Sequence, residues 1–297
     1  MKILITGSSG FVGRHLAAAL LADGHDVIGL GYHHQSVDHP RFSFIRADTT
    51  QPGDWQRAAA DVQAVVNLAG ANIFKRWNEK YKQAIHDSRI LTTRNLVTAL
   101  PADRNIVLCS TSAAGYYGDQ GDRLLDEQSP AGDDFLARVC VDWEKEAFAA
   151  ADKGVRVAAL RFGVVLDKTG GALAKMLPPF RLGLGGKIGS GRQWFPWITL
   201  ADLIQAVAFV LTNKKMRGPV NFCAPQAVTN KGFTEALAAA VRRPVFFTLP
   251  TPVLRLAAGE LGSLVLNSQR VTPKKLLSAG FVFRYPDIHS ALRASLR

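Results

Sequence analysis

Short apolar runs alternate with longer segments of helical periodicity over the first half of the chain. Runs rich in Val, Ile and Leu predict buried strands over 2–6, 25–30, 41–47, 62–68, 105–111 and 156–166. Between them, apolar residues recur at helical spacing over 11–24, 78–100 and 133–151. This alternation predicts an α/β fold, a doubly wound parallel sheet with helices on both faces and a ligand at the carboxyl ends of the strands.

Beyond residue 166 the pattern changes. We expect Gly170-Gly171 and Pro178-Pro179 to break the chain, and 183–191 holds five glycines in nine residues. Weaker patterns predict helices over 200–211 and 233–241, strands over 220–223 and 245–248, and a helical tail. We therefore assign 1–169 to a dinucleotide-binding domain. Residues 170–297 are expected to be mainly a smaller C-terminal substrate lobe, with segments returning to the main sheet.

The first predicted strand leads into three glycines at equal spacing, Gly7, Gly10 and Gly13. In a Rossmann-like fold, such a turn presents backbone N–H groups and a positive helix end to a pyrophosphate. A glycine turn in an ordinary α/β protein is the alternative, but the strand–helix context favours a dinucleotide. The residues predicted to bind it here are Thr6, Gly7, Gly10, Phe11, Val12 and Gly13.

The end of the second strand bears on the choice of cofactor. A carboxylate there binds the ribose of NAD, whereas a basic residue accommodates the 2′-phosphate of NADP. This chain has Gly31-Tyr32-His33-His34 and no carboxylate, which favours NADP(H) over NAD(H). The usual arginine is also missing, so Tyr32, His33 or His34 would substitute for it. Two solvated loop histidines are the alternative.

Composition narrows the choice of partners and compartment. A net charge of +12, spread along the chain, favours a small anionic substrate over nucleic acid. No apolar stretch approaches the roughly 20 residues of a membrane span, and the N-terminus leads straight into a strand, so we expect a cytoplasmic protein without a membrane partner. The three scattered cysteines suggest neither disulfides nor a metal site. A homodimer is left open.

The pattern T-G-x-x-G-x-x-G resembles the short-chain dehydrogenase/reductase superfamily, especially its extended branch. Further motifs resemble an atypical group within it, the epimerase family proteins of the YfcH type, which are nucleoside-diphosphate-sugar epimerase-like. These motifs are V-V-N-L-A-G, C-x-x-W-E, the glycine run 183–191 and the stretch 273–281. The likeness covers nearly the whole chain.

This resemblance implies further cofactor contacts. Asp48 flanks the adenine, Leu68-Ala69-Gly70 lines the middle of the cofactor, and Gly163-Val164 lies on the nicotinamide side. Arg89, on the helix predicted over 78–100, is expected to face the cofactor's charge, with a surface charge as the alternative.

The proton relay typical of these enzymes is absent. They carry Y-x-x-x-K, in which the lysine lowers the pKa of the tyrosine so that it can shuttle a proton. No tyrosine here has a lysine four residues later, and Cys140 and Glu144 occupy the expected positions. The loop after the fifth strand supplies the replacements: the catalytic residues predicted are Ser112, Tyr116 and Tyr117.

The glycine-rich run interleaves cations with tryptophans, a composition that suits a diphosphate and a sugar or base. The predicted substrate residues are Arg181, Arg192, Trp194 and Trp197; an irregular loop with core tryptophans is the alternative. The resulting expectation is an NADP-dependent oxidoreductase or epimerase that acts on a sugar nucleotide or similar anion. The rival expectation is an NADP(H)-binding sensor that performs no turnover.

Overall fold

Seven parallel strands form the central sheet of the computed structural model, which describes residues 1–260, 262 and 265–296. The strand order is β12-β7-β5-β4-β1-β2-β3, as in a Rossmann-like fold, so the predicted fold class is confirmed. The bounds are β1 (Lys2–Thr6), β2 (Asp26–Gly31), β3 (Phe42–Arg46), β4 (Ala64–Asn67), β5 (Val107–Ala113), β7 (Arg156–Phe162) and β12 (Gly218–Phe222).

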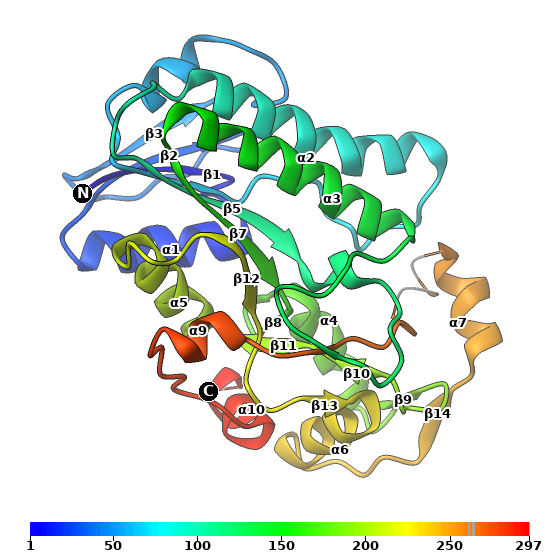
Figure 1. Cartoon of the computed structure of the whole chain (residues 1–297). Helices are drawn as coiled ribbons and strands as arrows, with labels where there is room; N and C mark the ends of the chain where they lie inside the picture. The colour runs from blue at the N-terminus through cyan, green and yellow to red at the C-terminus, as the bar shows by residue number, and fades with distance from the viewer. Residues whose placement is uncertain (261, 263–264, 297) are drawn as a thin grey trace.

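Two pairs of helices cover the sheet (Figure 1). Helices α1 (Phe11–Ala22) and α5 (Leu200–Thr212) lie on one face, and α2 (Glu79–Ala99) and α3 (Phe135–Phe148) on the other. Each helix buries an apolar stripe against the strands, Leu16 and Leu20 from α1 and Leu96 from α2 among them. Because parallel strands all end at one edge, this sandwich brings the loops after β1, β2, β4 and β5 together.

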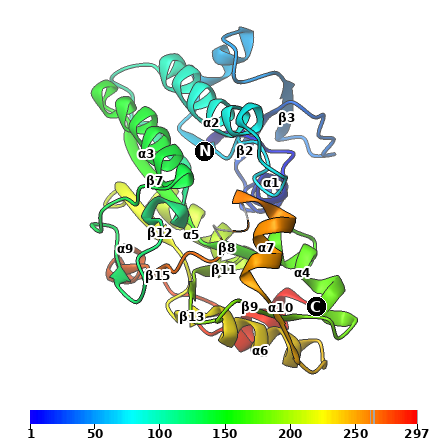
Figure 2. The ribbon, with the colours of Figure 1, turned by 90° about the vertical axis from the view of Figure 1, so that its right-hand side faces the viewer.

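The C-terminal elements pack around a core of their own, below the sheet in the view of Figure 2. Among them β9 pairs with β14 and β10 with β13, while two earlier strands, β8 and β6, pair with β11 and β15. Strand β12 lies in the main sheet beside β7. The division at residue 169 stays a prediction. The bounds are β6 (Leu124–Leu125), β8 (Val164–Asp167), α4 (Gly171–Arg181), β9 (Gly186–Ile188), β10 (Trp194–Phe195), β11 (Trp197–Thr199), β13 (Val228–Thr229), α6 (Asn230–Ala240), β14 (Phe247–Leu249), α7 (Thr251–Ala258), β15 (Arg270–Val271), α9 (Lys274–Ser278) and α10 (Ile288–Ser295).

The strand predicted over 156–166 is wrong as a single element, because it divides at Gly163 into β7 and β8. A Cβ on Gly163 would lie 3.0 Å from the Pro196 backbone, so glycine is what lets the two segments pass closely. Strand β8 then leaves the main sheet and pairs with β11.

The expected break at Pro178-Pro179 is also wrong, because both prolines lie inside α4. Proline lacks the N–H that would bond the carbonyl four residues earlier, which normally weakens a helix. Here Leu173, Leu177 and Phe180 face the C-terminal core, and their burial offsets that loss. Tertiary packing therefore overrides the local signal.

Candidate functional site

The turn between β1 and α1, the glycine loop (Gly7–Gly13), is shaped by close backbone approaches. Gly7 has φ of 66°, a conformation that favours glycine, and a Cβ there would lie 3.0 Å from the Leu68 carbonyl carbon. A Cβ on Gly13 would lie only 2.3 Å from the Gly7 oxygen. Gly10, in contrast, is exposed and has one neighbour, the Gly7 oxygen, 3.1 Å from its Cβ position. Gly7 and Gly13 are thus required by the fold, and Gly10 leaves open the space above the loop.

This loop fits a pyrophosphate group. Gly10 is the N-cap of α1 and no side chain caps the helix, so its first amides remain available as donors. The first turn of α1 holds no acidic residue that would repel an anion. Uncapped amides at a helix N-terminus without acidic neighbours are typical of a site that an anionic ligand completes.

The predicted adenosine end lies where β2 and β3 finish. Tyr32, His33 and His34 are exposed, and Asp48 caps a turn by accepting from the Thr50 amide at 3.0 Å. Sequence reasoning missed Arg46, which pairs with Gly31 across the two strands. Its Nε donates to the Tyr32 carbonyl at 3.2 Å, so this exposed cation lies at the end of β2. The signal that could have found it is a basic residue at the end of the neighbouring strand.

A buried polar network holds the loop after β4 in place. The Thr6 hydroxyl donates to Asn67 Oδ1 at 2.6 Å and accepts from the amides of Leu68 and Ala69 at 3.2 and 3.3 Å. Thr93 then accepts from Asn67 Nδ2 at 2.8 Å and from the Trp143 indole at 2.9 Å. The tryptophan of C-x-x-W-E therefore supports the floor of the predicted cofactor site from α3.

Arg89 lies beside this loop rather than on a solvated surface. A Cβ on Gly70 would be 3.0 Å from its Cζ, and its guanidinium donates to the carbonyls of Ile85 at 2.9 Å and Ala71 at 3.2 Å. It also lies over the Trp143 ring, 5.2 Å from the centroid. Burial lowers the pKa of this guanidinium, and no carboxylate in the described residues forms an ion pair with it. A half-buried cation without an anion is a strong candidate for contact with an anionic ligand.

An ion pair occupies the place of the missing relay. Glu144, on α3, receives hydrogen bonds from Arg161 Nε at 2.8 Å and Nη2 at 2.9 Å, and both side chains are more than nine-tenths buried. Burial alone would lower the pKa of Arg161, but the hydrogen bonds and charge of Glu144 more than offset this and raise it. Sequence reasoning missed Arg161, because nothing local shows that β7 brings it to α3.

The two loop tyrosines differ in accessibility. Tyr117 has no exposed surface; its hydroxyl accepts from Arg161 Nη1 at 3.0 Å and lies 2.7 Å from Asn221 Oδ1. Burial raises the pKa of this phenol, so the expectation that Tyr117 meets a substrate disagrees with its placement. Tyr116 is half-buried, and its ring lies flat against Arg161, whose Cζ is 3.4 Å from the ring centroid. Only Tyr116 combines accessibility with this support.

Ser112 and Cys140 complete the surroundings of Glu144. Ser112, in β5, is buried and donates its proton to Glu144 Oε1 at 2.7 Å, so toward a further group it can only accept. Burial, with the nearby Glu144 charge, raises the pKa of the Cys140 thiol to about 11. A thiol of this kind is unsuited to nucleophilic or proton-transfer chemistry.

The predicted substrate residues do not all come together. Trp197 is buried in the C-terminal core, where its indole donates to the Gln226 carbonyl at 3.1 Å, so the expectation that it faces a substrate is corrected to a packing role. Arg181 is exposed at the end of α4, and Arg192 is exposed in the turn before β10. Trp194 is half-buried, with its indole donating to Asp122 at 2.7 Å.

Comparison with known proteins decides the family. Residues 3–222 match the family described as NAD dependent epimerase/dehydratase, and residues 249–295 match a domain of unknown function, DUF1731. The chain belongs to the NAD-dependent epimerase/dehydratase family. An epimerase family protein of Mycobacterium bovis is 41% identical over 98% of this chain and 96% of its own length. A chloroplastic epimerase family protein of Arabidopsis thaliana is 39% identical over 100% of this chain and 87% of its own length.

Solved structures of this epimerase/dehydratase fold agree. The human epimerase family protein SDR39U1, crystallised with NADPH, is 34% identical with a TM-score of 0.86 over 99% of each chain. A UDP-glucuronic acid 4-epimerase from Bacillus cereus, in complex with UDP-glucuronic acid and NAD, is 18% identical with a TM-score of 0.79, covering 99% of this chain and 98% of its own, which shows the fold alone. Family membership supports binding of a nicotinamide dinucleotide and confirms the resemblance of the motifs.

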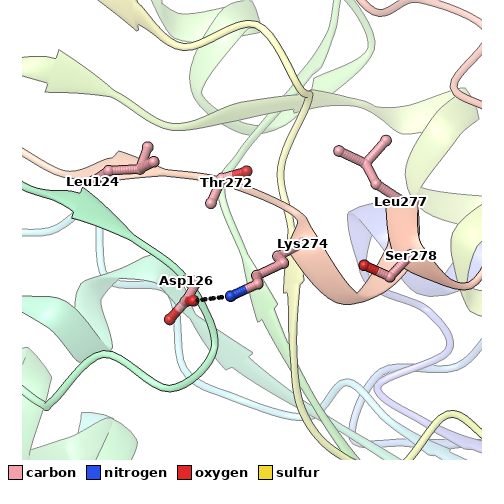
Figure 3. A pocket seen from close by; sticks show the side chains of 6 residues that line it. All are labelled: Leu124, Asp126, Thr272, Lys274, Leu277 and Ser278. Carbon is pink, nitrogen blue, oxygen red and sulfur yellow. Dashed lines mark hydrogen bonds and ion pairs between the residues drawn. The ribbon is translucent and has the colours of Figure 1, made fainter.

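Two surface pockets of this epimerase-family chain lie side by side, away from the glycine loop. They have volumes of about 410 and 460 Å³ and share Asp126, Lys274 and Ser278. Figure 3 shows the smaller one, where Lys274 forms an ion pair with Asp126 at 2.8 Å. Neither is lined by residues of the glycine loop or by Ser112 and Tyr116, so neither is the predicted cofactor or catalytic site.

The described residues form neither a metal-binding cluster nor a membrane-spanning helix. No group of three or more His, Cys, Asp or Glu side chains there is arranged to hold a metal ion. Within those ranges, no helix is both long and apolar enough to cross a membrane.

Proposed function

We propose that this chain is an NADP(H)-dependent oxidoreductase or epimerase that acts on a small anionic substrate, such as a sugar nucleotide. The uncapped glycine loop and the half-buried Arg89 support cofactor binding. The observation that carries the catalytic part is Tyr116, a half-buried phenol stacked on a buried guanidinium beside the position of the usual relay. A homodimer and a cytoplasmic setting stay predictions.

The roles follow from the side chains. A bound nicotinamide gives or takes a hydride at a substrate carbon. Tyr116 would give or take the proton at the neighbouring oxygen, as the tyrosine of the standard relay does. Ser112 has committed its proton to Glu144 and would accept a hydrogen bond from a substrate hydroxyl. Arg161 holds the plane of the Tyr116 ring, and Glu144 keeps Arg161 in place.

The catalytic assignment is tested with a screen of sugar nucleotides and small carbonyl compounds for oxidation of NADPH. On a substrate so found, Tyr116→Phe should lower the rate by roughly 10²–10⁴, the usual worth of general acid–base catalysis. Tyr117→Phe is the matched control: it removes a buried hydroxyl from the network and should mainly lower stability. Full activity of Tyr116→Phe would remove this assignment.

The cofactor preference rests on Arg46 and on the absence of a carboxylate at the end of β2. NADPH should bind more tightly than NADH by calorimetry, since a 2′-phosphate would meet the Arg46 guanidinium. Arg46→Ala should weaken NADPH binding while leaving NADH binding nearly unchanged. Arg57→Ala, which removes an exposed arginine that pairs with Asp54, serves as the control. Equal affinities of the wild type for both cofactors would contradict the preference.

A sensor without turnover is the second candidate. The observation in its favour is that α3 offers a closed ion pair and an un-ionised thiol where the relay should be. A broad screen without turnover, together with a partner protein whose affinity changes with NADPH, would favour this function.

A further inference from the structure

Arg270 is a cation whose hydrogen-bonding groups have no protein partner. It lies in β15, and none of its guanidinium nitrogens forms a hydrogen bond or ion pair with any described residue. Its Nε is fully enclosed, which makes it an orphaned buried donor. Native proteins seldom leave such a group unpaired, so its presence calls for an explanation.

The position of this guanidinium is fixed by stacking rather than by hydrogen bonds. Its Cζ lies 4.6 Å from the centroid of the Trp194 ring. Trp194 is itself anchored, because its indole donates to Asp122 and its amide donates to the Ser268 hydroxyl at 3.1 Å. A guanidinium held by its face keeps its N–H edge free to bind two oxygens of one phosphate or carboxylate group.

The segment that carries Arg270 is bound to the loop of the proposed catalytic site. Gln269 Nε2 donates to the Gly118 carbonyl at 3.1 Å, one residue after Tyr117. The Ser268 hydroxyl donates to the Gly121 carbonyl at 2.7 Å, and its amide donates to Asp119. Val271, next along β15, packs with Tyr117. Alternation along a strand therefore turns Arg270 to the opposite side, toward Trp194.

We propose that Arg270, supported by Trp194, binds an oxyanion of the substrate, a phosphate or carboxylate group. That the bound anion belongs to a substrate rests on the proposed function. Anion binding itself can be measured without turnover. An unpaired guanidinium destabilises the free protein, and a bound oxyanion would supply acceptors to those of its N–H groups that are not enclosed. Trp194 was predicted as a substrate residue. The cation that stacks on it is Arg270, not the predicted Arg181 or Arg192.

The test is a thermal-denaturation series without NADP(H). Inorganic pyrophosphate and malonate, the phosphate and carboxylate probes, are titrated into wild type and Arg270→Met. One of them should raise the melting temperature of the wild type and have a much smaller effect on Arg270→Met. Arg217→Met, which removes an exposed arginine lining the larger surface pocket, should respond as the wild type does. Pyrophosphate bound at the glycine loop would act equally on all three proteins and so cancel from the comparison.

Two further readouts separate anion binding from a structural role. Without anion, Arg270→Met should melt at the same temperature as the wild type or higher, because it removes an unpaired donor and retains packing on Trp194. Arg270→Lys keeps the charge and loses the two-donor edge, so its anion affinity should fall about tenfold. The proposal is overturned if neither probe stabilises the wild type, if Arg270→Met responds equally, or if Arg270→Met melts lower. A failed turnover screen would leave these results unaffected.

Discussion

The Glu144–Arg161 pair ties α3 to β7 in surroundings that water does not reach. The two charges are compensated by two short hydrogen bonds, and neither forms an ion pair with any other residue that the structure describes. Removing one member of such a pair leaves the other charge buried and unpaired, which typically costs about 3–5 kcal/mol. Glu146, also on α3, provides a comparison: it is half-buried and pairs with the exposed Arg94 of α2.

We predict that Glu144→Gln lowers the free energy of unfolding by about 3–5 kcal/mol. Glu146→Gln should lower it by about 1 kcal/mol or less, because an ion pair that water can reach contributes little. Urea denaturation followed by circular dichroism measures both. If the two variants lose the same small amount, the buried pair does not support the fold as described.

A second prediction at this scale concerns Arg89. Arg89→Met retains much of the packing and removes the charge, so cofactor affinity should weaken by about 1.5–3 kcal/mol, the range for hydrogen bonds to charged groups. Calorimetry with NADPH measures the change, and the melting temperature without cofactor shows whether the variant folds. Unchanged affinity in a folded variant would assign Arg89 to structure alone.

Burial of the cysteines predicts how stability depends on pH. Burial raises the thiol pKa of Cys140 to about 11 and of Cys109 to about 12, from an ordinary 9.0. Above pH 9 the unfolded chain releases these protons while the native chain keeps them, so the free energy of unfolding should fall as pH rises from 9 to 11. Urea titrations at pH 8 and 10 check this. A Cys109→Ala, Cys140→Ala variant should show a smaller decline.

At the scale of elements, the glycine loop contains one glycine that the fold needs, Gly13, and one that ligand binding is expected to need, Gly10. Gly13 faces the loop backbone at a distance that no Cβ tolerates, whereas Gly10 meets a single oxygen at 3.1 Å and has an ordinary φ of −71°. The same substitution at two positions three residues apart should therefore have different consequences.

We predict that Gly13→Ala strongly destabilises the protein by separating α1 from β1. Gly10→Ala should leave the melting temperature nearly unchanged and weaken NADPH binding, because its methyl group enters the space a pyrophosphate needs. Gly10→Val should abolish binding. Thermal denaturation and calorimetry of the three variants test the distinction. Tight NADPH binding by Gly10→Val would contradict the assigned position of the pyrophosphate.

The elements also show what local sequence can reveal. The strands β1 to β5 and the helices between them follow from periodicity and glycine spacing, since each is decided within about 20 residues. The division at Gly163 and the prolines inside α4 depend on segments far along the chain, Pro196 and the C-terminal core. For the same reason, Glu144 was visible as a departure from Y-x-x-x-K, while its partner Arg161 and the orphaned Arg270 were not.

At the scale of the whole molecule, one hydrophobic core crosses the predicted division at residue 169. Ile5 and Leu160 belong to the same cluster as Ile198, Leu203 and Phe222. Helix α5 covers the same face of the sheet as α1, and β12 extends the sheet beside β7 (Figure 1). Residues 1–169 alone would therefore expose one face of β5 and β7 to water.

This shared core predicts a single cooperative unfolding transition. If either part unfolded alone, it would expose the core surface of the other, so intermediates should be poorly populated even in a chain of 297 residues. Differential scanning calorimetry should give one peak with equal calorimetric and van't Hoff enthalpies. A bound cofactor should shift the whole peak, by about 2.7 kcal/mol of stability at 100 times its Kd. Two peaks, of which NADPH moves only one, would instead show that residues 1–169 fold independently of the C-terminal elements.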